Sequence, residues 1–272
     1  MHELGIAVAL VSASTQALAH AMLKAGRDKL VIRGLIGVTC AVGALPVACL
    51  VPLPGAVLWP WLALAGALHA TYQLVLIRAY EAADFAVAYP LARGIVPLAS
   101  ACVGVALLGD RLDAGAIAGV LAVTAGLGLV AGRARPVPAA LLAGLLTTAY
   151  TVVDGHAVRL APEAGTFIAW FFLVDGLIMG TLAACARRGR LPQLVRAEGR
   201  HGVLAGLASL LTYACALLAL RWLPVGEASA LRETSLVFGL ALARWGLREQ
   251  VGARRAAGAA LVALGGALIV LA

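Results

Sequence analysis

Residues 93–126 read RGIVPLASACVGVALLGDRLDAGAIAGVLAVTAG, and residues 232–265 read RETSLVFGLALARWGLREQVGARRAAGAALVALG. Both segments begin with a lone arginine in an apolar run, and these two arginines, Arg93 and Arg232, are 139 positions apart. At the same offset Gly119 and Gly126 return as Gly258 and Gly265, and Gly109-Asp110-Arg111-Leu112 returns as Arg248-Glu249-Gln250-Val251. The second half of the chain therefore repeats the first.

The composition is that of an integral membrane protein. Of the 272 residues, 62% are hydrophobic and 12% are charged, whereas a soluble domain has about 45–50% apolar and about 25% charged residues. The chain contains ten apolar runs, each near the roughly twenty residues that a helix needs to cross a bilayer. We therefore expect an all-α membrane protein with ten transmembrane helices, at about residues 4–23, 30–51, 57–79, 85–108, 113–131, 137–157, 165–186, 202–223, 224–246 and 254–272.

Each half of the chain holds five of these runs. The first five-helix repeat covers residues 1–135 and the second covers residues 136–272. Because five is odd, the second copy must enter the membrane from the opposite face. We therefore expect two inverted five-helix repeats, related by a pseudo-two-fold axis in the membrane plane.

Lysine and arginine residues are distributed unequally between the two sides of this bundle. Loops on the side of both termini hold three, Arg111, Arg159 and Arg221, and loops on the other side hold sixteen of the 21 in the chain. The positive-inside rule places the basic side in the cytoplasm and both termini outside, and we expect a multi-pass protein of the bacterial inner (plasma) membrane. The net charge of +8 is spread between apolar runs, which favours contact with an anionic leaflet and argues against nucleic acid as a partner.

Motifs for enzyme chemistry are absent from the sequence. There is no glycine-rich phosphate loop with Lys-Ser/Thr, no His-Glu-x-x-His zinc helix and no Gly-x-Ser-x-Gly elbow. The five cysteines all lie in apolar runs without metal-type spacing, so we interpret them as packing residues. We expect no enzyme activity, no cofactor and no metal.

The tetrapeptide Gly109-Asp110-Arg111-Leu112 closes the fourth run, and with ten spans in two repeats it resembles the EamA-type branch of the drug/metabolite transporter superfamily. In that family a Gly-Glu-Arg-like tetrapeptide commonly follows the fourth span and often the ninth. The second copy here, Arg248-Glu249-Gln250-Val251, is degenerate. The resemblance covers essentially the whole chain and implies a transporter, in a family that includes exporters of amino acids and metabolites and carriers of sugar phosphates. It also implies cytoplasmic termini, as in many members, which is the opposite of what the loop charges indicate.

The two arginines inside apolar runs are the strongest candidates for a binding site. A charge at the centre of a membrane helix costs about 2.5–3.5 kcal/mol on insertion scales, so Arg93 and Arg232 need a reason to be there. Inversion of the repeats brings both towards the midplane, where solute carriers bind their substrates. One interpretation is a clamp for a carboxylate, phosphate or phosphonate. The other is a structural ion pair with an acidic residue of the ninth run, Glu227 or Glu233, of which Glu227 is expected to be solvated.

Two prolines flank the first of these arginines. Pro90 and Pro97 each remove a backbone hydrogen bond, so we predict a break in the fourth helix. A broken helix at mid-depth is tolerated where it lines a cavity or is covered by protein. Tyr89 lies four residues before Arg93, on the same helical face, and joins the candidate substrate-binding residues.

Other runs carry polar residues on one helical face, and we predict two groups among them. Tyr72, Gln73 and Tyr213 are predicted to line the substrate cavity. Three further residues are candidates for a proton-coupling group or an ion-pair partner, with a plain interhelical hydrogen bond as the alternative: Glu233, Asp154 and His20. Asp175 lies deep in the seventh run with no assigned partner, and a pairing or coupling role is weighed there against simple packing.

These features predict a secondary active transporter that works by alternating access around a midplane site. The arginines favour a small anionic or zwitterionic metabolite, such as an amino acid, an organic acid, or a phospho- or phosphonate compound, with the proton as a candidate coupling ion. The alternatives are an exporter of cationic or amphiphilic compounds and a non-transporting membrane scaffold or accessory protein. Small residues in the fifth and tenth runs are explained either by packing within the chain or by a homodimer contact.

Overall fold

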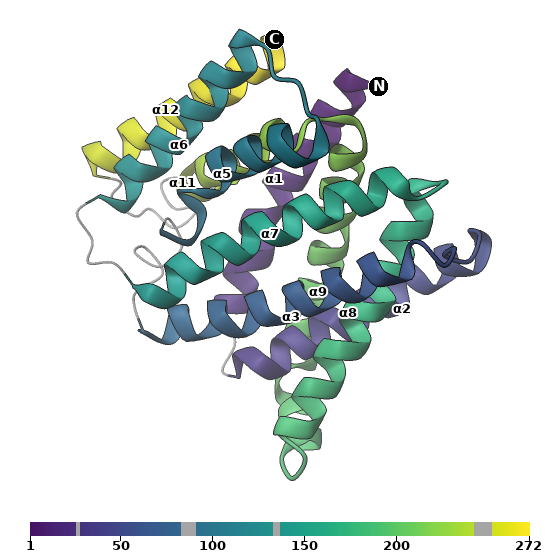
Figure 1. Cartoon of the computed structure of the whole chain (residues 1–272). Helices are drawn as coiled ribbons and strands as arrows, with labels where there is room; N and C mark the ends of the chain where they lie inside the picture. The colour runs from purple at the N-terminus through teal and green to yellow at the C-terminus, as the bar shows by residue number, and fades with distance from the viewer. Residues whose placement is uncertain (26–27, 83–90, 133–136, 242–251) are drawn as a thin grey trace.

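The computed structural model describes residues 1–25, 28–82, 91–132, 137–241 and 252–272, and all regular structure in these ranges is helical (Figure 1). The helices are α1 (His2–Ala25), α2 (Lys29–Leu50), α3 (Trp59–Ala82), α5 (Val96–Val103), the π-helical turn η1 (Gly104–Leu108), α6 (Ala114–Ala131), α7 (Pro138–Leu160), α8 (Ala164–Ala186), α9 (Leu191–Trp222), α10 (Val225–Glu233), α11 (Ser235–Ala241) and α12 (Ala253–Leu271). Eight helical segments among the described residues are long and apolar enough to cross a membrane. The chain is thus a multi-pass helical membrane protein.

The helices that fall short of that criterion include the pair in the ninth predicted span. α10 and α11 have nine and seven residues, and α10 carries three charged side chains, Glu227, Arg232 and Glu233. A chain segment this polar is stable inside an apolar bundle only where its charges find partners. Its surroundings are therefore where a functional site is expected.

Local chemistry explains where the helices begin and end. Asp28 accepts a hydrogen bond from the Val31 amide at the start of α2, and Asp113 accepts one from the Ala116 amide at the start of α6, as N-cap residues do. Gly109 ends η1 with φ of 69°, a left-handed conformation that glycine adopts without strain. This requirement accounts for the glycine of the tetrapeptide.

Two arginines cap the C-terminal ends of the neighbouring helices α7 and α9. Arg159, at the end of α7, donates to the carbonyl oxygens of Leu220 and Leu223 at the end of α9. Arg221, at the end of α9, in turn donates to the carbonyl oxygens of Val158 and Ala161 at the end of α7. Cations at helix C-termini satisfy carbonyl groups that have no intrahelical partner. Two of the three basic residues on the terminal side are therefore used in helix capping.

Asp28 also joins two helices on the opposite, basic side of the bundle. Its carboxylate accepts a hydrogen bond of 2.7 Å from Nε of Arg187, which follows α8. Burial raises the pKa of Asp28, but the hydrogen bonds from Arg187 and Val31 outweigh that effect and hold the pKa below its ordinary value. The start of α2 is thereby fixed to the end of α8.

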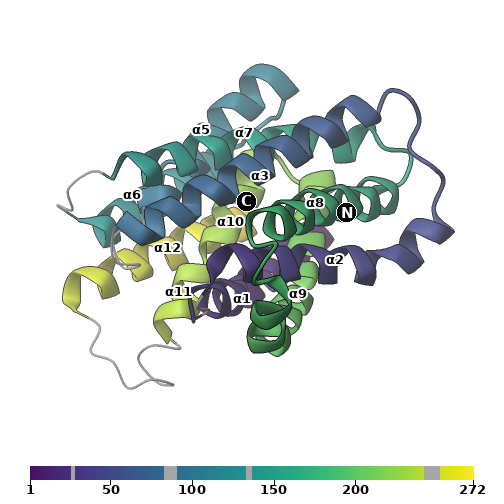
Figure 2. The same ribbon diagram turned by 90° about the horizontal axis from the view of Figure 1, so that it is seen from below.

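Helix pairs pack closely where glycines face one another. A methyl group on Gly176 of α8 would lie 2.5 Å from the carbonyl oxygen of Gly37 in α2, and one on Gly119 of α6 would lie 2.6 Å from that of Gly265 in α12. α6 and α12 run side by side in both ribbon views, as do α3 and α7 (Figures 1 and 2). Small residues allow this approach because no side chain separates the backbones.

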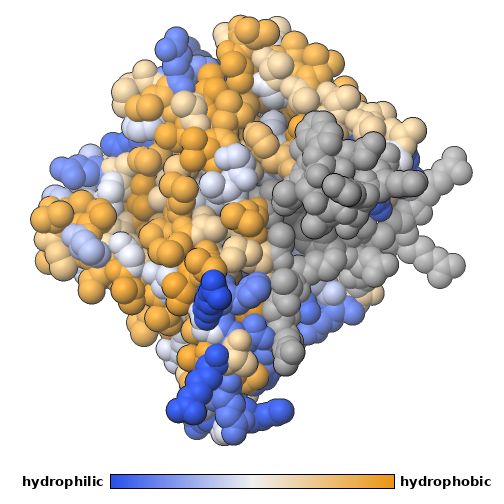
Figure 3. Space-filling model, turned by 180° about the vertical axis from the view of Figure 1, so that it is seen from behind, coloured by the Kyte–Doolittle hydropathy of each residue, from blue (hydrophilic) through white to orange (hydrophobic). Residues whose placement is uncertain are grey.

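The outer surface matches a lipid environment. Seen from behind, apolar residues predominate on the coloured part of the face, and polar residues gather at its lower tip (Figure 3). That tip is the turn between α8 and α9, where Arg188, Arg190, Arg196 and Arg200 are exposed. With 32 residues, α9 is about 48 Å long at 1.5 Å per residue, longer than a hydrocarbon core of about 30 Å. Its first turns therefore project from the bundle on the basic side.

The fourth predicted span is interrupted, in agreement with the proline pattern. Residues 91–93 are helical, a turn occupies Gly94 and Ile95, and α5 begins at Val96 with Pro97 in its first turn. A second interruption falls at Thr234, between α10 and α11. Thr234 is 139 positions after Ile95, and no proline causes this break. The sequence pattern did not predict it.

Candidate functional site

A cavity of about 110 Å³ lies beside the helical segments that precede these two interruptions. Its wall combines arginines with tyrosine, histidine, glutamine and phenylalanine side chains, which come from α1, α2, α3, α7, α8, α9, α10 and the helical residues before Gly94. The lining residues are Gln16, Ala19, Arg33, Ile36, Cys40, His69, Tyr72, Gln73, Arg93, Tyr150, Phe171, Phe172, Asp175, Ser209, Thr212, Tyr213 and Arg232.

Arg93 contributes to this wall while paired with a carboxylate. Its Nη1 lies 3.2 Å from Oε1 of Glu233, and both side chains are almost fully buried. This contact agrees with the interpretation in which Arg93 forms a structural ion pair with Glu233. The other carboxylate oxygen, Oε2, has no hydrogen-bond partner among the described residues. Desolvation of these charges is costly, so the pair is evidence of a polar site rather than of added stability.

Arg232 lies in the same cavity wall, but its guanidinium group has different contacts from that of Arg93. Its Nη2 donates a hydrogen bond of 3.4 Å to Oε1 of Gln16, and the guanidinium carbon lies 5.4 Å from the centre of the Tyr213 ring. Within the described ranges no carboxylate oxygen lies within 4.0 Å of it, and its Nε has no hydrogen-bond partner. A buried guanidinium with donors to spare is suited to binding an anionic group.

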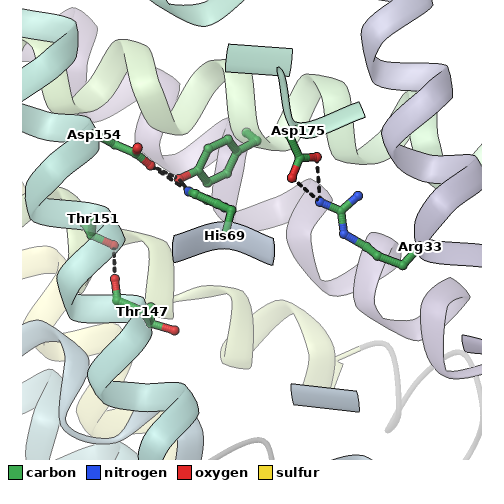
Figure 4. A network of polar contacts seen from close by, with 7 residues as sticks. Arg33, His69, Thr147, Thr151, Asp154 and Asp175 are labelled. Atoms are coloured by element: carbon green, nitrogen blue, oxygen red, sulfur yellow. Dashed lines mark hydrogen bonds and ion pairs between the residues drawn. The ribbon is translucent and has the colours of Figure 1, made fainter. Parts of the chain in front are cut away.

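A three-residue cluster of His69, Asp154 and Tyr213 joins α3, α7 and α9. Nε2 of His69 lies 2.9 Å from Oδ2 of Asp154 and 3.0 Å from the Tyr213 hydroxyl. The same hydroxyl donates to Oδ2 of Asp154. Figure 4 shows His69 directed at Asp154. Asp154 is fully buried behind the two residues that line the cavity.

A second buried charge pair occupies the cavity wall near α8. Nη2 of Arg33 donates to both carboxylate oxygens of Asp175, at 2.7 and 3.0 Å (Figure 4). Arg33 is one of the sixteen residues that the positive-inside count assigned to loops of the basic side, although it falls within the second predicted span, at residues 30–51. The loop assignment is wrong, because Arg33 is part of α2 and is 7% exposed. Asp175, which had no assigned partner, is thereby explained. A single basic residue close to a run of loop charges gave no signal of burial.

Aromatic rings pack around His69 and Tyr213 in the cavity wall. The His69 ring centre lies 4.0 Å from that of Tyr150 and 4.7 Å from that of Phe171. Phe171 in turn lies 5.5 Å from Phe172 and 5.4 Å from Tyr213, measured between ring centres. Sequence reasoning missed both phenylalanines, since an aromatic residue in an apolar helix has the same pattern whether it faces lipid, core or cavity.

The other predicted site residues divide into three groups. Tyr72 and Gln73 lie in the cavity wall beside Arg93, Arg232 and Tyr213. Glu227 was expected to be solvated, which is wrong: it is 5% exposed and its Oε2 lies 3.2 Å from Nε2 of His2. Three residues fall outside the part that the structure describes, Tyr89 and Pro90 entirely and His20 for its side chain.

The tetrapeptide that carried the family resemblance has a structural role. Oδ1 of Asp110 accepts a hydrogen bond of 2.6 Å from Arg159, and Oδ2 accepts one of 2.6 Å from the Val225 amide at the first turn of α10. Asp110 thus joins the end of η1 to α7 and α10. An acidic group at a helix N-terminus is favourable because it meets free amides and the positive end of the helix dipole.

Two of three comparisons relate this chain to known proteins. The chain is similar to a solved structure described only as a crystal structure of a protein, with 20% sequence identity, a TM-score of 0.73, and coverage of 99% of this chain and 98% of that one. No relative was found among curated proteins. The family model described as the EamA-like transporter family matches residues 135–271, about half of the chain. Members of that family are transporters rather than enzymes, and this chain, with its polar cavity between membrane helices, belongs to the EamA-like transporter family.

Proposed function

We propose that this protein is a secondary active transporter of a small anionic or zwitterionic metabolite in the bacterial inner membrane. The single observation that carries this proposal is Arg232, a 6% exposed guanidinium that lines the cavity and has no carboxylate oxygen within 4.0 Å among the described residues. Retaining such a charge in a membrane bundle is costly. The cost is offset when a carboxylate, phosphate or phosphonate occupies the cavity, because charge-assisted hydrogen bonds to arginine are strong and geometrically specific.

The proposal includes ten membrane spans in two inverted repeats, residues 1–135 and 136–272. The contact between α6 and α12 supports it. A methyl group on Gly119 or on Gly265 would lie 2.6 Å from the other residue's carbonyl oxygen, and Gly126 and Gly258 show the same reciprocity at 2.7 Å. At the offset of 139, Gly119 corresponds to Gly258 and Gly126 corresponds to Gly265. The repeat therefore relates the first of these contacts to the second. A two-fold axis between the helices produces such isologous contacts.

Two further observations agree with this axis. Gly37 and Gly176 are 139 positions apart and touch each other, as residues on a two-fold axis would. α1 and α3 are the first and third helices of the first repeat, and they correspond to α7 and α9 in the second. The packing of α1 against α9 therefore has its counterpart in the packing of α3 against α7. α6 and α12 are antiparallel, so the axis is perpendicular to both helices and lies in the membrane plane.

The interruptions at Gly94–Ile95 and at Thr234 support a moving site. Both fall directly after the residues around Arg93 and Arg232, at matched positions of the two halves. Transporters with inverted repeats commonly bind their substrates at broken helices near the midplane, and one bundle rocks against the other. We propose that the cavity opens alternately to the two sides by such a motion.

The termini are proposed to lie outside. The basic tip between α8 and α9 extends beyond the bundle, which suits contact with the anionic inner leaflet. On the opposite side, Arg159 and Arg221 are held by backbone carbonyl groups, so few free basic groups remain there. The positive-inside rule then favours a cytoplasmic tip.

Transport assays in proteoliposomes test the substrate class. The probes are radiolabelled L-glutamate, benzoate and glycerol 3-phosphate, with ethidium as a cationic probe. We expect the wild-type protein to exchange at least one anionic or zwitterionic probe. Arg232→Ala should raise the KM for that probe about tenfold to a hundredfold, because a hydrogen bond to a charged group contributes about 1.5–3 kcal/mol and about 1.4 kcal/mol is tenfold.

Arg78→Ala is the matched control, because Arg78 is exposed on α3 and does not line the cavity. It should transport like the wild type. Unchanged kinetics in Arg232→Ala at equal protein levels would contradict the anion clamp. Movement of ethidium alone would favour a cation exporter, and no movement of any probe together with a co-purifying enzyme would favour a scaffold.

A further inference from the structure

The His69, Asp154 and Tyr213 cluster has a definite proton requirement. Three polar atoms lie within hydrogen-bonding distance of one another: Nε2 of His69, Oδ2 of Asp154 and the Tyr213 hydroxyl. The tyrosine proton serves the contact with Asp154. The contact of 2.9 Å between His69 and Asp154 needs another proton, since a bare imidazole nitrogen and a carboxylate oxygen are both acceptors.

These two protons still leave the cluster with one negative charge. Asp154 is 0% exposed, and its second oxygen, Oδ1, has no hydrogen-bond partner among the described residues. A buried carboxylate whose negative charge no neighbouring proton or cation balances is strongly disfavoured. One further proton, on the carboxyl group or on the imidazole, makes the cluster neutral. The cluster is therefore built to take up and release one proton.

The cluster is open to the cavity on one side. His69 and Tyr213 line the cavity, whereas Asp154 lies behind them. A proton that enters with the cavity facing one side of the membrane can leave after the cavity has turned to the other side. We infer that His69, Asp154 and Tyr213 form the proton-binding site that couples this transporter to the proton gradient, an inference that rests on the proposed transport function.

The groups around the cluster determine the direction of coupling. The guanidinium carbon of Arg232, on α10, lies 5.4 Å from the centre of the Tyr213 ring. The other charged and titratable groups that face the cluster are Tyr72 of α3, Tyr150 of α7, Arg33 and Cys40 of α2, Asp175 of α8, and the Arg93–Glu233 pair, while α1 presents the uncharged Gln16. Two of the three arginines are already paired with carboxylates, which leaves Arg232 as the positive charge that acts on the cluster within the described residues.

An anion bound at Arg232 cancels this positive charge. The cluster then binds its proton more readily, and by linkage the protonated cluster binds the anion more tightly by the same factor. A cationic solute would have the opposite effect and would expel the proton. The geometry therefore assigns symport: the proton and the anionic or zwitterionic solute cross in the same direction.

Two measurements test this site, and the first of them does not depend on transport. The first is infrared difference spectroscopy of the protein in lipid nanodiscs without solute, between about pH 5 and about pH 8, the range in which imidazole groups titrate. We expect one protonation signal, from a carboxyl or an imidazolium group, that is lost in Asp154→Asn and in His69→Gln. It should persist in His156→Gln, the matched control, because His156 lies on α7 against Trp61 and outside the cavity wall.

The second measurement uses the probe that the wild type moves among L-glutamate, benzoate and glycerol 3-phosphate. Asp154→Asn mimics the protonated site, so it should exchange this probe across the membrane but should not accumulate it when a pH gradient is imposed. Tyr213→Phe keeps the ring and removes one proton contact, so it should shift the pH profile of accumulation. His156→Gln should accumulate the probe as the wild type does.

Accumulation by Asp154→Asn in response to the pH gradient, or an infrared signal that survives in both Asp154→Asn and His69→Gln, would overturn the proton site. These outcomes leave the proposed transport function intact as long as exchange is measured. The absence of any exchange by the wild type would instead contradict the proposed transport function. The infrared measurement would still show whether the cluster binds a proton.

Discussion

At the scale of single residues, charge in this membrane bundle is neutralised in pairs. Arg33 pairs with Asp175 and Arg93 with Glu233, and all four side chains are at most 8% exposed. Arg232, by contrast, has no carboxylate oxygen within 4.0 Å among the described residues. Pattern recognition found Arg93 and Arg232 because each stands alone in an apolar run. It missed the pairing of Arg33, because a basic residue near a helix end is read as part of a loop.

The Arg33–Asp175 pair gives a stability prediction. Removal of one partner leaves an uncompensated buried charge, which costs about 3–5 kcal/mol, whereas replacement of both by apolar residues of similar volume is about neutral. We therefore expect Asp175→Leu to lower the midpoint temperature of unfolding in detergent well below that of the wild type. The double variant Arg33→Met with Asp175→Leu should recover most of the loss. A double variant no more stable than the single one would show that the pair itself stabilises the bundle.

At the scale of helices, the repeat is preserved most clearly where backbones touch. The glycines shared by the fifth and tenth predicted spans form the α6–α12 contact, so packing within the chain accounts for them. Most helix limits were predictable because apolar runs of bilayer length leave few alternatives. The start of α9 is the exception: the eighth span was predicted to begin at residue 202, which is wrong, because the polar residues before it are helical from Leu191 onward. The break at Thr234 was not predictable, since neither proline nor glycine occupies that position. The polar cluster was only partly predictable, because the choice of neighbours depends on tertiary packing.

The α2–α8 contact predicts a large penalty for small-to-large substitution. A methyl group on Gly176 would already lie 2.5 Å from the Gly37 carbonyl oxygen, so Gly176→Leu has to push the helices apart. Overpacking typically costs about 1–3 kcal/mol, occasionally more. We expect a lower unfolding midpoint and a smaller folded fraction in detergent. Gly128→Leu is the control, because a methyl group on Gly128 would meet no neighbouring helix within 4 Å, and equal behaviour of the two variants would contradict the packing account.

At the scale of the whole molecule, pseudo-symmetry and chemical asymmetry have different roles. The proposed two-fold axis relates Arg93 to Arg232 and the break at Ile95 to that at Thr234. The halves differ where Gly94 corresponds to Glu233, and this difference pairs one arginine and leaves the other available. A symmetric scaffold can thus rock between two equivalent openings while a single asymmetric charge binds the solute.

The proposed motion requires one residue of the cavity to be reachable from both sides of the membrane. Gln73 is half-buried and lines the cavity, so Gln73→Cys, in a chain whose five native cysteines are replaced by alanine, reports on access. A second variant in the same background, Ala272→Cys, reports the side of the C-terminus. Under the proposed orientation it reacts only with a membrane-impermeant reagent added from outside.

Labelling of Gln73→Cys with a membrane-impermeant maleimide, in right-side-out and in inside-out vesicles, tests the central claim most directly. We predict reaction from both sides, protection by the transported probe, and loss of that protection when Arg232→Ala is added. Reaction from one side only, or protection that does not depend on Arg232, would contradict an alternating cavity with Arg232 as its anion-binding group.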